Sequence, residues 1–255
     1  MSYDLAAMIP LDRRKSDTLL IQPLPPAVLE ADVVKVFLPI ITGWLERVGD
    51  MAAVKPVFDA APDEGESERT YEQTAAMLAT LAAGLSVLSL KIEQWHRSRW
   101  VDVVLRQTGM HVGPLLLDPV NLGQIFTAWS TSLIRTVNDD IRGKIATAVR
   151  LAALNKQTPS QLARTLRGIV NGSRKRVEFI ARDQLLKYAA QLTEYRHREA
   201  GIKHYVWRHS HLPNPREHHL ARDGKKFAWN KPPVGGHPGH EPNCRCYAVA
   251  VIPRL

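Results

Sequence analysis

A long stretch without proline constrains the fold of this chain most strongly. From Arg69 to about Leu105 the sequence is rich in Ala and Leu, and its apolar residues recur at intervals of three and four. This spacing places them on one side of an α-helix, which makes a turn about every 3.6 residues. The stripe comprises Met77, Leu78, Leu81, Leu85, Leu88 and Ile92, and Trp95 and Trp100 extend it. The sequence therefore predicts one long helix that buries this stripe against another helix.

Further helices are predicted on both sides of this one. They span residues 28–54, with interruptions at Pro39 and Gly43, and residues 120–154, 159–171 and 173–200. Thr158 can cap the third of these, and Pro159 sits at the first helical position, where its missing N–H costs no hydrogen bond. Asn171 and Gly172 are residue types that commonly end a helix. The N-terminal two thirds of the chain is therefore expected to be mainly helical.

Three regions are predicted along the chain. Residues 1–66 begin with a proline-rich irregular arm of about 30 residues and continue as a broken helix. An acidic linker at 56–68 follows and runs across the boundary with the next region. Residues 67–145 form a helical docking region, and residues 146–255 form a separate C-terminal domain. No run of 18 apolar residues and no secretory leader is recognised, so no membrane partner is expected.

The character of the sequence changes after Gly201. Residues 203–207 and 246–253 are rich in β-branched and aromatic side chains, which is typical of strands. Gly, Pro, Asn and His dominate the residues between them, and loops that long need a metal or a partner to hold them. The predicted fold class is α+β: a mainly helical N-terminal part and a small loop-rich domain with a few short antiparallel strands.

The positive charge is confined to the last third of the chain. Residues 171–255 contain 16 Lys and Arg against 7 Asp and Glu, whereas residues 1–170 contain 18 of each kind. A basic unit suits nucleic acid or an acidic protein surface, although a solvated basic face would give the same count. Lys225, Lys226 and Lys231 are expected to be exposed and available to double-stranded DNA.

Cysteine and histidine are concentrated at the C-terminal end. The two cysteines are separated by one residue, a spacing that strains a disulfide and favours thiols in a reducing compartment. With nearby histidines they could supply the four nitrogen or sulfur ligands of one structural zinc ion, through His219, His240, Cys244 and Cys246. The alternative is a set of hydrogen-bonded histidines beside a buried thiol pair with no cofactor.

Several short motifs follow one another in this region. They are the helical step Arg182-Asp183-Gln184, the strand residues Tyr205 and Trp207, the pair Arg216 and His219, Gly224, and the sequence Asn243-Cys244-Arg245-Cys246. In this order they resemble the C-terminal domain of the phage Mu F-like (MuF) head-morphogenesis family, over roughly residues 145–255. The step is commonly Arg-Thr-Glu in that family, so this chain departs from the pattern there.

The resemblance implies a minor capsid protein of a tailed phage rather than an enzyme. It would act with the portal protein, the major capsid protein or a scaffold protein during head assembly or DNA packaging. Its location would be the virion, inside the head or at the portal vertex, after assembly in the host cytoplasm. The alternative from the residues alone is a metal-dependent DNA nuclease with a His-rich C-terminal site.

Overall fold

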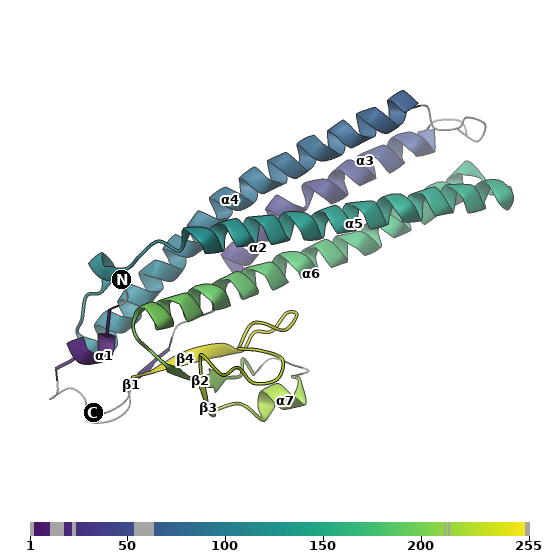
Figure 1. The fold of residues 1–255 in the computed structure, drawn as a ribbon. Coiled ribbons are helices and arrows are strands. Elements are labelled where there is room, and N and C mark those ends of the chain that lie inside the picture. The colour runs from purple at the N-terminus through teal and green to yellow at the C-terminus, as the bar shows by residue number, and fades with distance from the viewer. Residues whose placement is uncertain are drawn as a thin grey trace. The chain divides into compact units, whose positions relative to one another are not determined.

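The computed structural model describes residues 3–10, 18–21, 24–53, 64–211, 213 and 215–252. Contacts group the chain into two units, each assembled from segments that are distant in the sequence. The sheet unit comprises Met1–Leu29, Ser89–Gln124 and Asp183–Leu255, and the helical unit comprises Glu30–Leu88 and Ile125–Arg182. Three long helices, α4 (Glu64–Thr108), α5 (Val120–Leu154) and α6 (Pro159–Glu199), contribute residues to both units (Figure 1). The division of the chain into separate regions at residues 66 and 145 stays a prediction.

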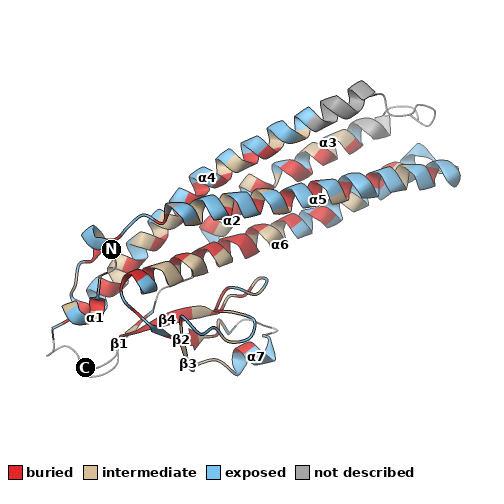
Figure 2. Ribbon diagram, in the orientation of Figure 1, coloured by how far each residue is buried: buried red, intermediate tan, exposed pale blue. Residues whose placement is uncertain are grey.

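The helical unit buries the predicted apolar stripe of α4. Leu78, Leu81, Leu85 and Leu88 are buried there and Met77 is half-buried, while Ile92 and Trp100 continue the buried face into the sheet unit. Buried positions recur along all three long helices (Figure 2). By length and composition alone, Glu72–Thr108 within α4 would also pass as a membrane-spanning helix, a property that core helices share. The expectation that no membrane is involved stays a prediction.

Two short helices complete the helical unit. They are α2 (Ala27–Phe37) and α3 (Pro39–Ala53), so the predicted interruption at Pro39 is confirmed. Gly43 does not interrupt α3, because glycine keeps its backbone N–H and can stay in the helical ladder. Inside the unit, Trp44 Nε1 donates a hydrogen bond to Asn138 Oδ1 at 2.9 Å.

The predicted break at Asn171 and Gly172 is wrong, because α6 runs without interruption from Pro159 to Glu199. Both residues are exposed, whereas Val170 and Val177 on the opposite side are buried. A glycine inside a helix costs about 1 kcal/mol, and burying one large aliphatic side chain contributes about 1.5–3 kcal/mol. Packing on both sides of the glycine therefore outweighs its preference for a helix end.

The start of α4 also differs from the prediction. The helix begins at Glu64, so residues 64–68 of the expected acidic linker are helical. The rest of that linker lies outside the described part of the chain. No proline occurs after residue 62 in this stretch, so nothing in the backbone prevents the helix from starting early.

The sheet unit contains a four-stranded antiparallel sheet in the order β1-β4-β2-β3. Its strands are β1 (Thr18–Leu20), β2 (His204–Arg208), β3 (Lys226–Ala228) and β4 (Tyr247–Ile252), and a one-turn helix, α7 (Glu217–Leu220), lies between β2 and β3 in the chain. The two predicted strands are confirmed as β2 and β4. The mainly helical architecture with a small antiparallel sheet is therefore the one that the sequence predicts.

The N-terminal arm is not irregular throughout, which corrects the prediction. Residues 5–8 form α1 (Leu5–Met8), capped by Asp4, whose side chain accepts a hydrogen bond from the Ala7 amide. Strand β1 then pairs with β4, in the register Leu20 to Ala250. Leu5 and Leu20 are fully buried in a core shared with α4 and β4. Pairing with a distant strand explains the miss, because local composition carries no signal for it.

Candidate functional site

The C-terminal motif residues are brought together by the pairing of β2 with β4. Tyr205 lies opposite Ala250 and Trp207 opposite Ala248, so the end of β2 lies beside the start of β4. Gly224 makes the turn into β3 at a φ of +75°, a conformation that favours glycine, and its amide donates to the Trp207 carbonyl. The strand that carries Tyr205 and Trp207 therefore lies directly beside the C-terminal strand.

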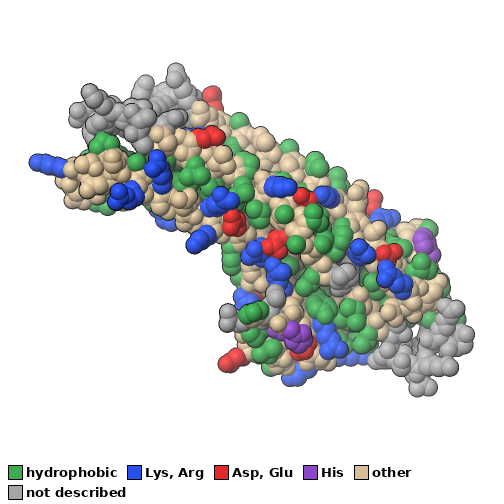
Figure 3. Space-filling model, turned by 180° about the vertical axis from the view of Figure 1, so that it is seen from behind, with side chains coloured by type: hydrophobic (Ala, Val, Ile, Leu, Met, Phe, Trp, Pro, Cys, Tyr) green, Lys and Arg blue, Asp and Glu red, His purple; other side chains and the backbone are tan. Residues whose placement is uncertain are grey.

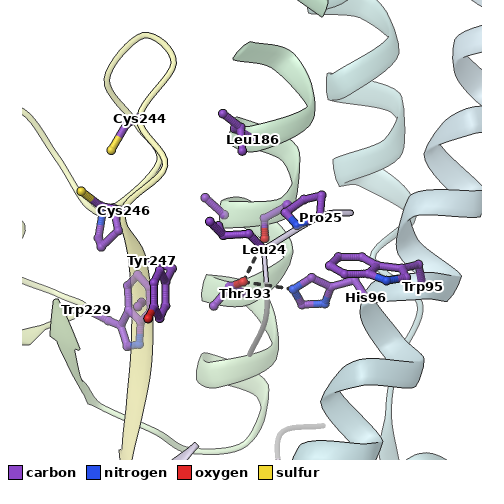
Figure 4. A pocket seen from close by; sticks show the side chains of 14 residues that line it. Leu24, Pro25, Trp95, His96, Leu186, Thr193, Trp229, Cys244, Cys246 and Tyr247 are labelled. Atoms are coloured by element: carbon purple, nitrogen blue, oxygen red, sulfur yellow. Dashed lines mark hydrogen bonds between the residues drawn. The ribbon is translucent and has the colours of Figure 1, made fainter. Parts of the chain in front are cut away.

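Three buried side chains form the centre of the site. His219 is carried by α7, and Cys244 and Cys246 lie in the segment immediately before β4. The Nδ1 atom of His219 lies 3.6 Å from the Cys244 sulfur and 3.5 Å from the Cys246 sulfur. The fold therefore brings His219 beside both cysteines. In Figure 4 the two sulfur atoms point toward one another across the loop.

The two thiols share their ionisation. A hydrogen bond from Cys246 lowers the pKa of the Cys244 thiol, and the Gly239 amide donates to its sulfur at 3.4 Å. The same hydrogen bond, with burial, raises the pKa of the Cys246 thiol. Two neighbouring buried thiolates repel each other, so the pair readily carries one negative charge and resists a second.

The imidazole of His219 is held in its neutral form. Burial lowers the pKa of His219, and the nearby Glu241 carboxylate only partly opposes this. Its Nε2 atom lies 3.3 Å from Glu241 Oε1, so the two ring nitrogens face a carboxylate on one side and two sulfurs on the other. The ring of Trp207 packs edge-on against it at 5.2 Å between centroids.

Glu241 connects this centre to the surface, although it was not among the residues predicted for the site. Its carboxylate accepts a hydrogen bond from His218 Nε2 at 2.8 Å and pairs with Arg216 Nε at 3.2 Å. Burial raises the pKa of Glu241, but hydrogen bonds from His218 and His219 outweigh it and hold the pKa below its usual range. Arg216 also donates to the Pro242 carbonyl, so this motif arginine holds the loop as well as the carboxylate.

The helical step Arg182-Asp183-Gln184 acquires a role that its sequence did not reveal. Asp183 is buried, and its Oδ1 atom accepts a hydrogen bond from the Asn243 amide at 2.7 Å. Lys187 pairs with the other oxygen at 2.6 Å. Asn243 itself has a φ of +51°, a conformation in which Asn is common among non-glycine residues. The acidic residue of the step therefore fixes the loop that carries the cysteines.

The other predicted site residues do not belong to this group of three side chains. His240 is exposed, and in the described part of the chain it belongs to neither group of side chains with metal-ligand spacing. Those groups are His219, Cys244 and Cys246, and His218, His219 and Glu241. Arg245 is half-buried between the cysteines. Lys225, Lys226 and Lys231 are exposed, as expected.

A cavity on the α6 side of the cysteines is too small for a substrate. It measures about 30 Å³ and lies among Leu186, Thr193 and Trp229, with the Thr193 hydroxyl hydrogen-bonded to His96 (Figure 4). Sites for small molecules usually enclose roughly 300–1,000 Å³. This cavity is therefore well below the size of a usual small-molecule site.

Comparison with known proteins agrees with the motifs. Residues 143–249 match a family described as Phage Mu protein F like protein. The chain is also 35% identical over 150 residues to an uncharacterized protein of Haemophilus influenzae, a match that covers 57% of this chain and 34% of that protein. The chain thus spans about a third of the curated relative, and no solved structure matches it. The resemblance predicted from the C-terminal motifs is confirmed: residues 143–249 carry the sequence of the Phage Mu protein F like family.

Proposed function

We propose that this protein is a minor capsid protein of a tailed phage that acts in head morphogenesis. The observation that carries the proposal is the match of residues 143–249 to the Phage Mu protein F like family. The Haemophilus influenzae relative is itself uncharacterized and adds no function. The C-terminal cluster supports a structural role, because its polar groups bind one another and the cavity beside its cysteines measures only about 30 Å³.

The proposed partner of the helical docking region, residues 67–145, is the portal protein. Ile125 and Trp129 lie four residues apart on α5 and hence on one side of the helix, with 44% and 64% of their surfaces exposed. Large exposed apolar side chains, tryptophan above all, are typical of protein interfaces.

The portal contact can be tested with one substitution and a matched control. Trp129→Ser is expected to lower the number of copies per purified head while leaving the thermal stability of the free protein unchanged. Leu154→Ser removes a similarly exposed apolar side chain from α5 outside the docking region, and it should leave the copy number unchanged. Equal incorporation of Trp129→Ser and wild type would contradict docking through this side of α5.

Packaged double-stranded DNA is the second proposed partner. The exposed Lys225, Lys226 and Lys231 are available to phosphates. On the face shown in Figure 3, however, Lys and Arg alternate with Asp and Glu, so this face favours weak contact without sequence preference. Affinity should fall steeply with salt, and replacing the three lysines by Gln should reduce the salt slope by about 3. Failure of the full chain to bind DNA at about 50 mM salt would exclude this partner.

The nuclease alternative rests on His218, His219 and Glu241, which have metal-ligand spacing. A plasmid-cleavage assay of the purified full chain with Mg²⁺, Mn²⁺ or Zn²⁺ separates the two functions. The head-protein proposal predicts no cleavage above the level of a His219→Ala variant. Metal-dependent cleavage that His219→Ala abolishes without unfolding the protein would replace it with the nuclease function.

A further inference from the structure

The group formed by His219, Cys244 and Cys246, which has metal-ligand spacing, has the geometry of a metal centre. A zinc ion binds sulfur at about 2.3 Å and imidazole nitrogen at about 2.0 Å, so a tetrahedral angle places the two ligand atoms about 3.5 Å apart. The observed separations from His219 Nδ1 are 3.6 Å to Cys244 and 3.5 Å to Cys246. All three side chains are buried, so the arrangement does not arise from loose surface residues. We propose that His219 Nδ1, Cys244 and Cys246 bind one zinc ion, with a water molecule as the fourth ligand.

The charge distribution of the centre supports a cation. Cys244 and Cys246 lie one residue apart immediately before β4, so two thiolates at these positions would repel each other. A divalent ion removes that repulsion because it binds both thiolates directly. The backbone amide of Gly239 also points at the Cys244 sulfur, which suits an anionic thiolate ligand.

The imidazole is oriented as a ligand of this kind requires. Coordination through Nδ1 needs the ring proton on Nε2, and Nε2 faces Glu241 at 3.3 Å. A carboxylate behind a metal-binding histidine is the usual second partner, because it fixes the tautomer and strengthens the ligand. Glu241 is itself held by Arg216 and His218, so the carboxylate is positioned before an ion arrives.

The ion would join two segments that are distant in the sequence. His219 comes from α7, whereas the cysteines precede β4, and the residues between them are mostly loop. Short helices and long loops have little core of their own, so a metal link is an effective way to order them. His240, which the sequence placed among the ligands, lies outside the group and is not needed.

The test uses the full chain, purified with reductant and without chelator after growth in zinc-supplemented medium. Elemental analysis should find about one zinc per chain in the wild type and in His240→Ala, and below about 0.1 in Cys246→Ser and His219→Ala. Exchange into Co²⁺ should produce a thiolate-to-cobalt charge-transfer band in the wild type, a readout that does not depend on whether any variant folds. A reduced wild type with two freely titratable thiols and no bound zinc after dialysis against zinc would overturn the proposal, as would a Cys244–Cys246 disulfide in the freshly purified protein.

A softer variant tests the orientation of the histidine. Glu241→Gln keeps the size of the side chain, and it should weaken zinc affinity by about 10–100-fold in a competition titration with a chromophoric chelator. His204→Gln changes an exposed histidine on β2 and serves as its control, with wild-type affinity expected. Unchanged affinity in Glu241→Gln would show that the ring is not bound through Nδ1 with Glu241 behind it.

Discussion

Arg196 is the buried charge whose removal should most affect the sheet unit. Its side chain is fully buried, and it pairs with Glu93 of α4 and with Glu199 of α6, which are only 14% and 4% exposed. It also donates to the Leu117 carbonyl at 2.6 Å, while the Leu117 amide donates to Glu199. One guanidinium therefore joins α4, α6 and the loop before α5.

Replacing Arg196 by Met removes the guanidinium from the Glu93 and Glu199 carboxylates and from the Leu117 carbonyl, and leaves Glu199 only the Leu117 amide as a donor. Removing one partner from a buried ion pair costs about 3–5 kcal/mol, because the remaining charge stays desolvated. For a chain of this size that loss lowers the melting temperature by roughly 6–20 °C. Calorimetry of Arg196→Met and wild type at pH 7 measures it.

A matched control separates the buried pair from a surface pair on the same helix. Arg174 pairs with Glu178 while their side chains are 52% and 37% exposed, so Arg174→Met should cost below about 0.5 kcal/mol. Adding Glu93→Gln and Glu199→Gln to Arg196→Met should recover most of the lost stability, since no unpaired charge remains. The reasoning fails if Arg196→Met is as stable as Arg174→Met, or if the triple variant is less stable than the single one.

Three further predictions concern stability. Leu20→Ala in β1 should cost about 2–5 kcal/mol in urea unfolding, because Leu20 is fully buried; a loss below about 1 kcal/mol would show that β1 is dispensable. Burial lowers the pKa of His197 from 6.5 to about 3, so on acidification the unfolded chain binds a proton before the folded chain does. The free energy of unfolding should therefore fall by up to about 1.4 kcal/mol per pH unit as the pH drops from 6.5 toward 3. His197→Phe should flatten that slope in unfolding measured at pH 7, 6 and 5, and an unchanged slope would refute the assignment. Gly239→Ala should destabilise the chain, because Gly239 has a φ of +87° and a Cβ there would lie 2.5 Å from the Ala190 Cβ. Gly172→Ala, in open space within α6, should instead stabilise the chain by about 0.5–1 kcal/mol. A higher melting temperature for Gly239→Ala than for Gly172→Ala would contradict both placements.

The fold was predictable where the signal is periodic and local. The stripe from Met77 to Ile92 predicts α4 because its spacing reflects one buried face, and Pro39 marks a break because it lacks an N–H. Gly172 misled the prediction, since a glycine signals a helix end only when tertiary packing does not span it. Strand β1 could not be found, because its partner β4 lies more than 200 residues away in the sequence.

The candidate site divides in the same way. His219 and the cysteines could be selected because their residue types suit metal ligands, and the pairing of β2 with β4 brings them together. Glu241 and Asp183 are ordinary acids in the sequence, and only the folded loops show that one orients His219 and the other holds Asn243. His240 was selected by proximity in the sequence, which does not determine where an exposed side chain points.

The central proposal, that this is a head protein, is tested most directly by locating the chain in purified phage heads. Particles from a phage that encodes it would be purified by density gradient, and its copy number relative to the portal and major capsid proteins measured by quantitative mass spectrometry. The proposal predicts a fixed low ratio to the portal protein in DNA-filled heads, and density for the chain at the portal vertex or head interior in a head map. Recovery of the protein only in the soluble fraction, with none in heads or assembly intermediates, would contradict it.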